Sequence, residues 1–492
     1  SVPLKATIKP PRARALCMCI SNFAITKFVL RGGTTAPGVQ RARRFMSAGM
    51  LACSCCLAAA GAGALPSTQH RGTVADVPLF VTFDSKINAA SIRPGPDQVA
   101  FLSQEVFVWG ADPQHPTLDA WLALEPRVEL SYYMPYSRAP AARLGFDLAY
   151  FLKYHPDWVM YRCDRKTVAF WGDETASDGS VPLDFTNPDV VEWQISNQST
   201  TAQKLGYSAM AFDNFGGGAR QGANPGDACG VWQRNGTWKQ VFPAVPKGDG
   251  SLEFAEASIR WIQQAKQRMA VHAPGMGIVP NICIDRPSTG GVWRNSSIHG
   301  DWATSAAAKL VSAASTGMLS ERGFTGWGGE RAGQAELEDE LRWMAELARQ
   351  GKSYYSINEV KASEWSDAWV SWVIGCFLLG KQPGSALWLG TVQGYGNWSF
   401  SSPALSAPVG QPLGAYSSTT TGLLLRNYTR ALILVNPTGG FPKPSDGRAL
   451  SVTLGNLAQY TDLFGRPPAG VKGDVVTLQK QTAQVLLRTK WH

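Results

Sequence analysis

Short apolar runs alternate with longer amphipathic segments from Val77 onward, and this alternation constrains the fold more than any other feature. Eight runs have the length and composition of buried strands. They lie at 79–83, 106–109, 128–133, 208–215, 278–284, 317–320, 353–360 and 386–389. Helical patterns occupy 116–124, 188–205, 252–271, 302–314, 335–349 and 363–379. Eight strands with interleaved helices over about 310 residues predict an α/β architecture, the (β/α)8 barrel.

The pattern changes after residue 400. Residues 401–421 are rich in Pro, Ser, Gly and Thr, which indicates a connecting segment. Five short alternating strands without helices follow it, at 423–426, 431–435, 450–454, 475–478 and 483–487. We therefore predict a barrel domain over 75–400 and a small antiparallel, sandwich-like β-domain over 420–492.

The first 70 residues carry nine Lys and Arg side chains and no Asp or Glu. Within them, a basic stretch at 41–44 precedes an apolar run at 51–65, which suits a signal-peptide core and is too short for a membrane span. Small residues at 60–64 offer a cleavage site. We therefore expect 1–70 to be a targeting segment, and secretion or delivery to the endomembrane lumen. An organelle transit peptide is the alternative, and no later stretch is apolar enough to span a membrane.

The net charge of +9 lies in this leader, because the rest of the chain carries 37 basic and 37 acidic side chains. A folded body without net charge has no global attraction for a phosphate backbone. The sequence therefore argues against a nucleic-acid partner.

Cysteines and sequons both favour an oxidising compartment. Five of the nine cysteines lie in the leader, and the others, without any C-x-x-C spacing, are Cys163, Cys229, Cys283 and Cys376. We expect one or two disulfides and no zinc site. Five N-x-S/T sequons occur in the body, at Asn197, Asn235, Asn295, Asn397 and Asn427.

Acidic residues near the C-terminal ends of the strands are the catalytic candidates, because that face of a barrel forms the active site. Asp213 follows the apolar residues 209–212, where a carboxylate would be costly unless it points into a polar site. Glu321 follows the sixth run and Glu359 lies in the seventh. A pair of carboxyl groups is what cleavage of a glycosidic bond requires. The structural alternatives are a turn cap for Asp213, a salt bridge with Arg322 for Glu321, and a purely structural role for Glu359.

A second group of strand-end residues has side chains suited to binding sugar hydroxyls or stacking on sugar rings. These substrate-binding candidates are Asp84, Trp109, Tyr133, Asn214, Asn281, Asp285 and Trp327. Tyr132 and Tyr136 are further candidates for an aromatic platform, although each ring could equally pack in the core. Residues 216–250 lack helical periodicity and predict a long structureless loop, which in barrels tends to be functional.

Other kinds of site find no support in the sequence. It contains no Walker loop, no G-x-S-x-G elbow and no dinucleotide-binding glycine spacing. Metal-ligand spacing is absent among four histidines of the body, His115, His155, His272 and His299. We therefore expect neither a metal ion nor a cofactor, and structural or surface roles for these histidines.

Three segments resemble the middle of glycoside-hydrolase barrels: HPDWVMY at 155–161, LDFTNPDVVEW at 183–193 and LGYSAMAFDNF at 205–215. Segments 426–438, 460–465 and 475–487 resemble the β-domain that follows such barrels. Over roughly 77–490 the chain is similar to the hypothetical glycosyl-hydrolase family fifteen, whose architecture is that of the α-galactosidase-like superfamily. Ser and Ala stand in the third segment where the family pattern often has Asp or Gly.

The resemblance implies a glycosidase with Asp213 as nucleophile after strand four and Glu321 as acid/base after strand six, where the superfamily commonly has Asp. We therefore expect a retaining O-glycoside hydrolase that acts on a poly- or oligosaccharide. The alternatives are a non-catalytic sugar-binding barrel and an extracellular structural protein. Carboxyl groups more than ~10 Å apart would favour the first alternative, and an exposed apolar patch the second.

Overall fold

The computed structural model describes the parts of the chain that form the barrel and the C-terminal sheets. The described residues are 76–82, 105–111, 128–139, 146–170, 180–215, 228–244, 252–282, 306–321, 323–326, 329–392, 402–440, 446–455 and 457–489. The predicted targeting segment 1–70 and the predicted helix 116–124 lie outside these ranges.

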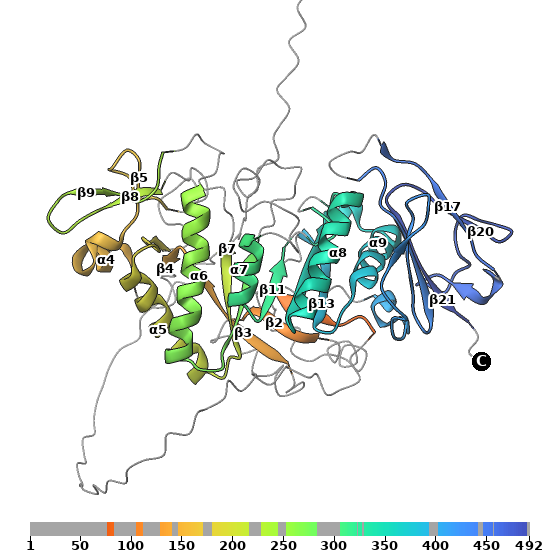
Figure 1. Ribbon diagram of the computed structural model, residues 1–492, viewed down its shortest axis with the longest axis horizontal. Coiled ribbons are helices and arrows are strands. Elements are labelled where there is room, and N and C mark those ends of the chain that lie inside the picture. The colour runs from red at the N-terminus through yellow and green to blue at the C-terminus, as the bar shows by residue number, and fades with distance from the viewer. Residues whose placement is uncertain are drawn as a thin grey trace, which may run out of the picture. The chain divides into compact units, whose positions relative to one another are not determined.

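Eight parallel strands form a closed barrel, as the sequence predicts (Figure 1). In chain order they are β1 (Leu79–Thr82), β2 (Glu105–Ala111), β3 (Glu129–Pro135), β7 (Ala209–Phe215), β10 (Gly277–Ile282), β11 (Gly317–Ser320), β12 (Ser353–Val360) and β13 (Ser385–Thr391). Each strand pairs with the next in this order, and β13 pairs with β1. The eight strands therefore follow one another around the barrel in chain order, as in a (β/α)8 barrel.

Helices precede five of these strands and cover the outside of the barrel (Figure 1). They are α5 (Pro188–Lys204), α6 (Leu252–His272), α7 (Ala306–Ala314), α8 (Gln334–Arg349) and α9 (Asp367–Gly380). The predicted helix 363–379 begins late, because the Ser366 side chain accepts a hydrogen bond from the backbone of Trp369 and caps the helix there. Residues 362–364 form a separate 3-10 turn.

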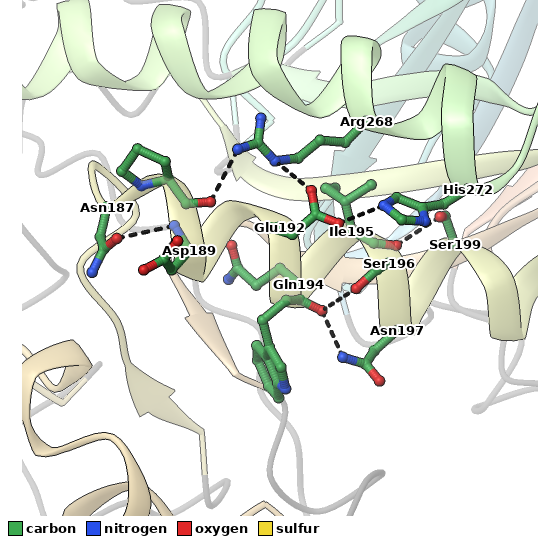
Figure 2. A network of polar contacts seen from close by, with 12 residues as sticks. Asn187, Asp189, Glu192, Gln194, Ile195, Ser196, Asn197, Ser199, Arg268 and His272 are labelled. Carbon is green, nitrogen blue, oxygen red and sulfur yellow. Dashed lines mark hydrogen bonds and ion pairs between the residues drawn. The ribbon is translucent and has the colours of Figure 1, made fainter.

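Polar contacts fix α5 at its start and against α6 (Figure 2). The Asn187 side chain accepts a hydrogen bond of 3.0 Å from the backbone two residues on, and Pro188 begins the helix, as the sequence predicts. Glu192 of α5 pairs with Arg268 at 3.0 Å and with His272 at 2.5 Å, both on α6. His272 thus has the structural role that the sequence indicated.

The prediction of a structureless loop at 216–250 is wrong in part, because the segment contains the hairpin of β8 (Ala228–Trp232) and β9 (Trp238–Gln240). An Asn-Gly turn at 235–236 closes the hairpin, with Gly236 at φ +78°. β8 also pairs with β5 (Tyr161–Arg162), and a disulfide joins Cys163 to Cys229 beside that pairing. A further pair of short strands is β4 (Arg138–Ala139) with β6 (Val181–Pro182), and the helical turns α4 (Leu148–Tyr154) and η3 (Pro156–Trp158) precede β5.

The C-terminal part forms two antiparallel sheets, and all five predicted strands are present. One sheet has the order β14 (Ser417–Ser418), β15 (Leu424–Asn427), β16 (Ala431–Asn436), β21 (Thr482–Arg488) and β18 (Tyr460–Thr461). The other has the order β17 (Leu450–Thr453), β20 (Val475–Leu478) and β19 (Val471–Lys472). The three strands that the sequence did not reveal have only two residues each, too few to show an alternating pattern.

Helix α9 joins the barrel to the first of these sheets. The buried Arg426 side chain donates hydrogen bonds to the backbone oxygens of Leu378, Leu379 and Lys381 at 2.9–3.1 Å. These are carbonyl groups at the C-terminal end of α9 that have no partner within the helix. A Cβ atom at Gly375 would lie 2.7 Å from Ala483, so a glycine lets β21 approach the helix closely.

The barrel interior is a separate apolar cluster beneath the strand ends. Tyr355 lies in it, stacked on Phe107 with ring centroids 4.4 Å apart. Burial raises the pKa of the Tyr355 phenol, and the charge of Glu129 raises it further. This apolar layer lies directly below any site at the C-terminal ends of the strands. Among the described residues, no helix has the length and apolar character needed to cross a membrane.

Candidate active site

The alternation of side chains along β7 and β10 places two polar residues inside the barrel. Successive strand residues point to opposite faces, so residues two apart share a face. Ala209 and Ala211 belong to the interior cluster, and Asp213 follows on the same face of β7. Val279 belongs to it as well, and Asn281 follows on the same face of β10. Asp213 and Asn281 therefore lie side by side at the C-terminal ends of neighbouring strands.

The same alternation places Glu359 on the inward face of β12 and Glu321 directly after the end of β11. Glu321 comes two residues after Leu319, which packs in the barrel interior, and Glu359 comes two residues after Ile357, which does the same. Glu359 is buried and Glu321 is partly buried. The three predicted catalytic residues thus come from strands four, six and seven of the barrel and share its inward face.

Asp213 is only 3% exposed and accepts a hydrogen bond on each carboxylate oxygen. The Tyr133 hydroxyl, from β3, donates to Oδ2 at 2.7 Å. The Asn281 amide nitrogen donates to Oδ1 at 3.0 Å. These two donors come from the strands on either side of β7 and fix the orientation of the Asp213 carboxyl group.

Asn281 connects Asp213 to Glu321. The same amide nitrogen that donates to Asp213 also donates to Oε2 of Glu321, at 2.8 Å. Because the bonds of 3.0 and 2.8 Å share one nitrogen, Oδ1 of Asp213 and Oε2 of Glu321 lie at most 5.8 Å apart, the sum of the two lengths. The sequence predicted these three residues in one site, and the structure brings them into one hydrogen-bonded group.

Two residues that the sequence did not single out fix the loop that follows β11 against β12. Asn358 of β12 is fully buried, and its side-chain oxygen accepts a hydrogen bond of 2.7 Å from the backbone of Phe324. Gly323 has φ +43°, and a Cβ atom there would lie 2.5 Å from the backbone oxygen of Ile357. The Gly-rich composition of this loop was the only sequence signal for such a close approach.

Three predicted platform aromatics are packing residues instead. Trp109 has no exposed surface, and its indole nitrogen donates to the backbone oxygen of Val279 at 3.0 Å inside the barrel. Tyr132 points away from the interior and packs edge-on against Tyr207. Tyr136 is 1% exposed and shares a hydrogen bond of 2.7 Å with Ser258. Burial without an open ring face excludes sugar stacking for these three in the structure described.

Several other predictions for binding residues stay untested. Tyr133 lies against Trp109 with ring centroids 6.0 Å apart and donates its hydroxyl hydrogen to Asp213. The side chains that lie outside the described residues are those of Asp84, Asn214, Asp285 and Trp327. Within the described ranges, no three His, Cys, Asp or Glu side chains are grouped in a way that could hold a metal ion.

Comparisons with known proteins give matches among solved structures alone. No protein-family model matches the chain, and no curated protein matches it. The glycoside hydrolase domain of PelA from Pseudomonas aeruginosa is 12% identical and covers 66% of this chain and 99% of its own, with a TM-score of 0.36. Amy13B from Eubacterium rectale is 10% identical, with coverages of 84% and 95% and a TM-score of 0.40.

A third similar structure is a GH36 α-galactosidase from Geobacillus stearothermophilus. It is 10% identical, covers 84% of this chain and 55% of its own, and has a TM-score of 0.39. TM-scores at this level carry no argument about function. The assignment of the barrel fold comes from the strand pairing of this chain. Any argument about its chemistry comes from the residues at the strand ends.

Proposed function

We propose that the protein is a retaining O-glycoside hydrolase that acts on a poly- or oligosaccharide. The observation that supports this most strongly is the shared hydrogen bonding of Asp213 and Glu321 to one nitrogen of Asn281. It keeps Oδ1 of Asp213 and Oε2 of Glu321 at most 5.8 Å apart, which is the sum of the two bond lengths. Retaining glycosidases hold their carboxyl groups ~5–5.5 Å apart, and inverting ones ~6.5–9.5 Å apart.

In the first step, a carboxylate oxygen of Asp213 attacks the anomeric carbon of the sugar. The bond between that carbon and the glycosidic oxygen breaks, and its electron pair goes to the oxygen. Glu321, in its acid form, gives its proton to that oxygen, so the leaving group departs as a neutral alcohol. The product of this step is a sugar ester of Asp213.

In the second step, water attacks the same carbon of the ester. Glu321, now ionised, takes a proton from the water and returns to its acid form, while the carbon–oxygen bond to Asp213 breaks. The sugar leaves with its original anomeric configuration, because two inversions restore it. The cycle consumes one water molecule and restores both side chains.

The assignment of roles follows the environments of the two groups. Asp213 accepts hydrogen bonds on both oxygens, which hold its carboxyl group in one orientation and suit a nucleophile that must be aimed at one carbon. Glu321 is partly exposed at the strand end, where a leaving group and then water can reach it. Glu359 remains the competing candidate for the acid, because it shares the inward face.

A sugar-binding barrel without catalysis would need no close carboxyl pair. For that alternative, we expect the carboxyl groups to lie more than ~10 Å apart. The hydrogen bonds through Asn281 do not allow such a distance between Oδ1 of Asp213 and Oε2 of Glu321. The close pair therefore favours catalysis over binding alone.

We also propose that the protein is secreted or resides in the endomembrane lumen. The disulfide between Cys163 and Cys229 supports this, since such bonds persist in oxidising compartments. The sequon at Asn235 lies in the exposed turn of the β8–β9 hairpin, where a glycan could be attached.

A screen against chromogenic and polymeric glycosides tests the proposed activity. The wild type should hydrolyse at least one member, and Asp213→Asn should lose ~10⁴-fold or more of that rate without losing its fold. Asp189→Asn, an exposed carboxylate at the start of α5, is the matched control and should keep full activity. Hydrolysis that persists in Asp213→Asn would contradict the assignment, and an inactive wild type would contradict the function.

A further inference from the structure

The Asn281 side chain uses one atom to contact both carboxyl groups. It is 1% exposed on β10, and its amide nitrogen donates to Asp213 at 3.0 Å and to Glu321 at 2.8 Å. A carboxamide nitrogen carries two hydrogens. Each carboxyl group therefore takes one of them, and the nitrogen has no donor left for another partner.

The orientation of the amide follows from these partners. With the group turned over, its oxygen would face two carboxyl groups and be repelled by any negative charge on them. In the orientation that the structure shows, the Asn281 oxygen is buried and has no hydrogen-bond partner among the described residues. A buried acceptor without a partner costs stability. The fold thus tolerates a cost at this position in order to direct both N–H groups at the carboxyl pair.

We propose that Asn281 is the positioning residue of the pair, and that it makes Oε1 of Glu321 the oxygen that carries the catalytic proton. This inference rests on the proposed function. The carbonyl oxygen of a carboxylic acid is a better acceptor than its hydroxyl oxygen, so the amide favours the acid form of Glu321 whose proton lies on Oε1. In that form, the proton reaches the leaving group from Oε1.

A neutral donor suits both halves of the reaction. In the acid form of Glu321, Oε2 is the carbonyl oxygen and accepts from Asn281, and in the ionised form it still accepts. The bond therefore persists while the proton leaves and returns. A lysine in this place would stabilise two negative charges and oppose reprotonation of Glu321. The amide fixes the geometry of the pair without fixing its protonation state.

Leaving-group dependence separates this role from a merely structural one. For the sugar identified in the screen, the 2,4-dinitrophenyl, 4-nitrophenyl and phenyl glycosides demand progressively more help from the acid. We expect Asn281→Ala to lower kcat/KM roughly 100-fold or more for the phenyl glycoside. For the dinitrophenyl glycoside, the fold-loss in kcat/KM should be smaller by a factor of at least ~10. Asn281→Asp keeps the shape and the acceptor but loses the two N–H groups, and should show the same pattern.

The matched control is Asn436→Ala in the C-terminal sheets, where a buried asparagine donates to the backbone oxygens of Arg448 and Leu478. It should change the three substrates equally, if at all. Equal losses on all three substrates in Asn281→Ala, or wild-type rates in Asn281→Asp, would overturn the inference while leaving the proposed function standing. An inactive wild type would overturn both.

Discussion

Gln481 and Arg331 bond to each other in both directions, although 150 residues separate them along the chain. The Gln481 side chain donates to the backbone oxygen of Arg331 at 3.0 Å, and the Arg331 guanidinium donates to the backbone oxygen of Gln481. Gln481 lies in the turn between β20 and β21, and Arg331 lies in the loop that follows Glu321. The C-terminal sheets thus hold the loop of the proposed acid.

We predict that breaking this contact slows catalysis more than it destabilises the fold. Gln481 has φ +51°, a conformation that glycine adopts without strain, so Gln481→Gly removes the side-chain bond and relieves the backbone. kcat should fall by roughly 3- to 10-fold, because small displacements of a catalytic group are costly, while KM changes little. Steady-state kinetics beside a thermal melt measure both effects. An unchanged kcat would contradict the contact's positioning role.

We predict that Gly323→Ala is more damaging than its backbone conformation alone explains. A Cβ atom there meets the Ile357 backbone oxygen at 2.5 Å, whereas Gly275, at φ +85°, has nothing within 4 Å of the same position. Gly275→Ala should cost about 1 kcal/mol of unfolding free energy, and Gly323→Ala about 1–3 kcal/mol more. Urea denaturation of both variants measures the difference. Equal costs would mean that the close approach is absent.

The buried Lys381 predicts a specific dependence of stability on pH. Burial, with a contribution from Arg426, lowers its pKa to about 8, and Asp76 acts in the opposite direction. Between pH 8 and 10.5 the unfolded chain holds a proton that the folded chain has lost, so stability rises with pH in that window. The unfolding free energy of the wild type relative to Lys381→Met should therefore increase from pH 7.5 to pH 10, as measured by denaturant titration.

Lys361→Met, at an exposed lysine beside Glu364, is the control for that titration. A difference between the wild type and Lys381→Met that stays constant or falls over the same range would show that burial does not lower the pKa of Lys381.

We predict that two of the sequons behave differently in a eukaryotic secretory host. Asn235 lies in an exposed hairpin turn, while the Asn197 amide donates to the backbone of Trp193 at 2.8 Å within α5. Ser199, the third residue of that second sequon, is fully buried. Asn235→Gln should therefore remove one glycan from the secreted protein, and Asn197→Gln none, by intact mass. A glycan on Asn197 of the secreted protein would contradict this prediction.

The strand pattern and the rule of alternation could predict much of the fold and of the site. The run 208–215 has an acidic residue near its end, Asp213, and the inward position of that residue follows from Ala209 and Ala211. Alternation also explains one error, because the adjacent residues Tyr132 and Tyr133 point to opposite faces, and only Tyr133 reaches Asp213.

Contacts between distant segments could not be predicted in this way. Nothing near Asn358 in the sequence indicates that its side chain accepts a hydrogen bond from Phe324, 34 residues earlier. The burial of Trp109 depends likewise on a backbone oxygen of β10 on the far side of the interior, at Val279. Such pairings are set by barrel closure, so composition and periodicity carry no trace of them.

Trapping of the proposed ester tests whether Asp213 is the nucleophile. The 2-deoxy-2-fluoro derivative of the active glycoside, with a dinitrophenyl leaving group, should form an ester with the nucleophile that is stable enough for peptide mass spectrometry. We expect one added fluorosugar on the peptide that contains residues 209–215, located at Asp213. A label on Glu321 or Glu359, or turnover with inversion and no label, would contradict it.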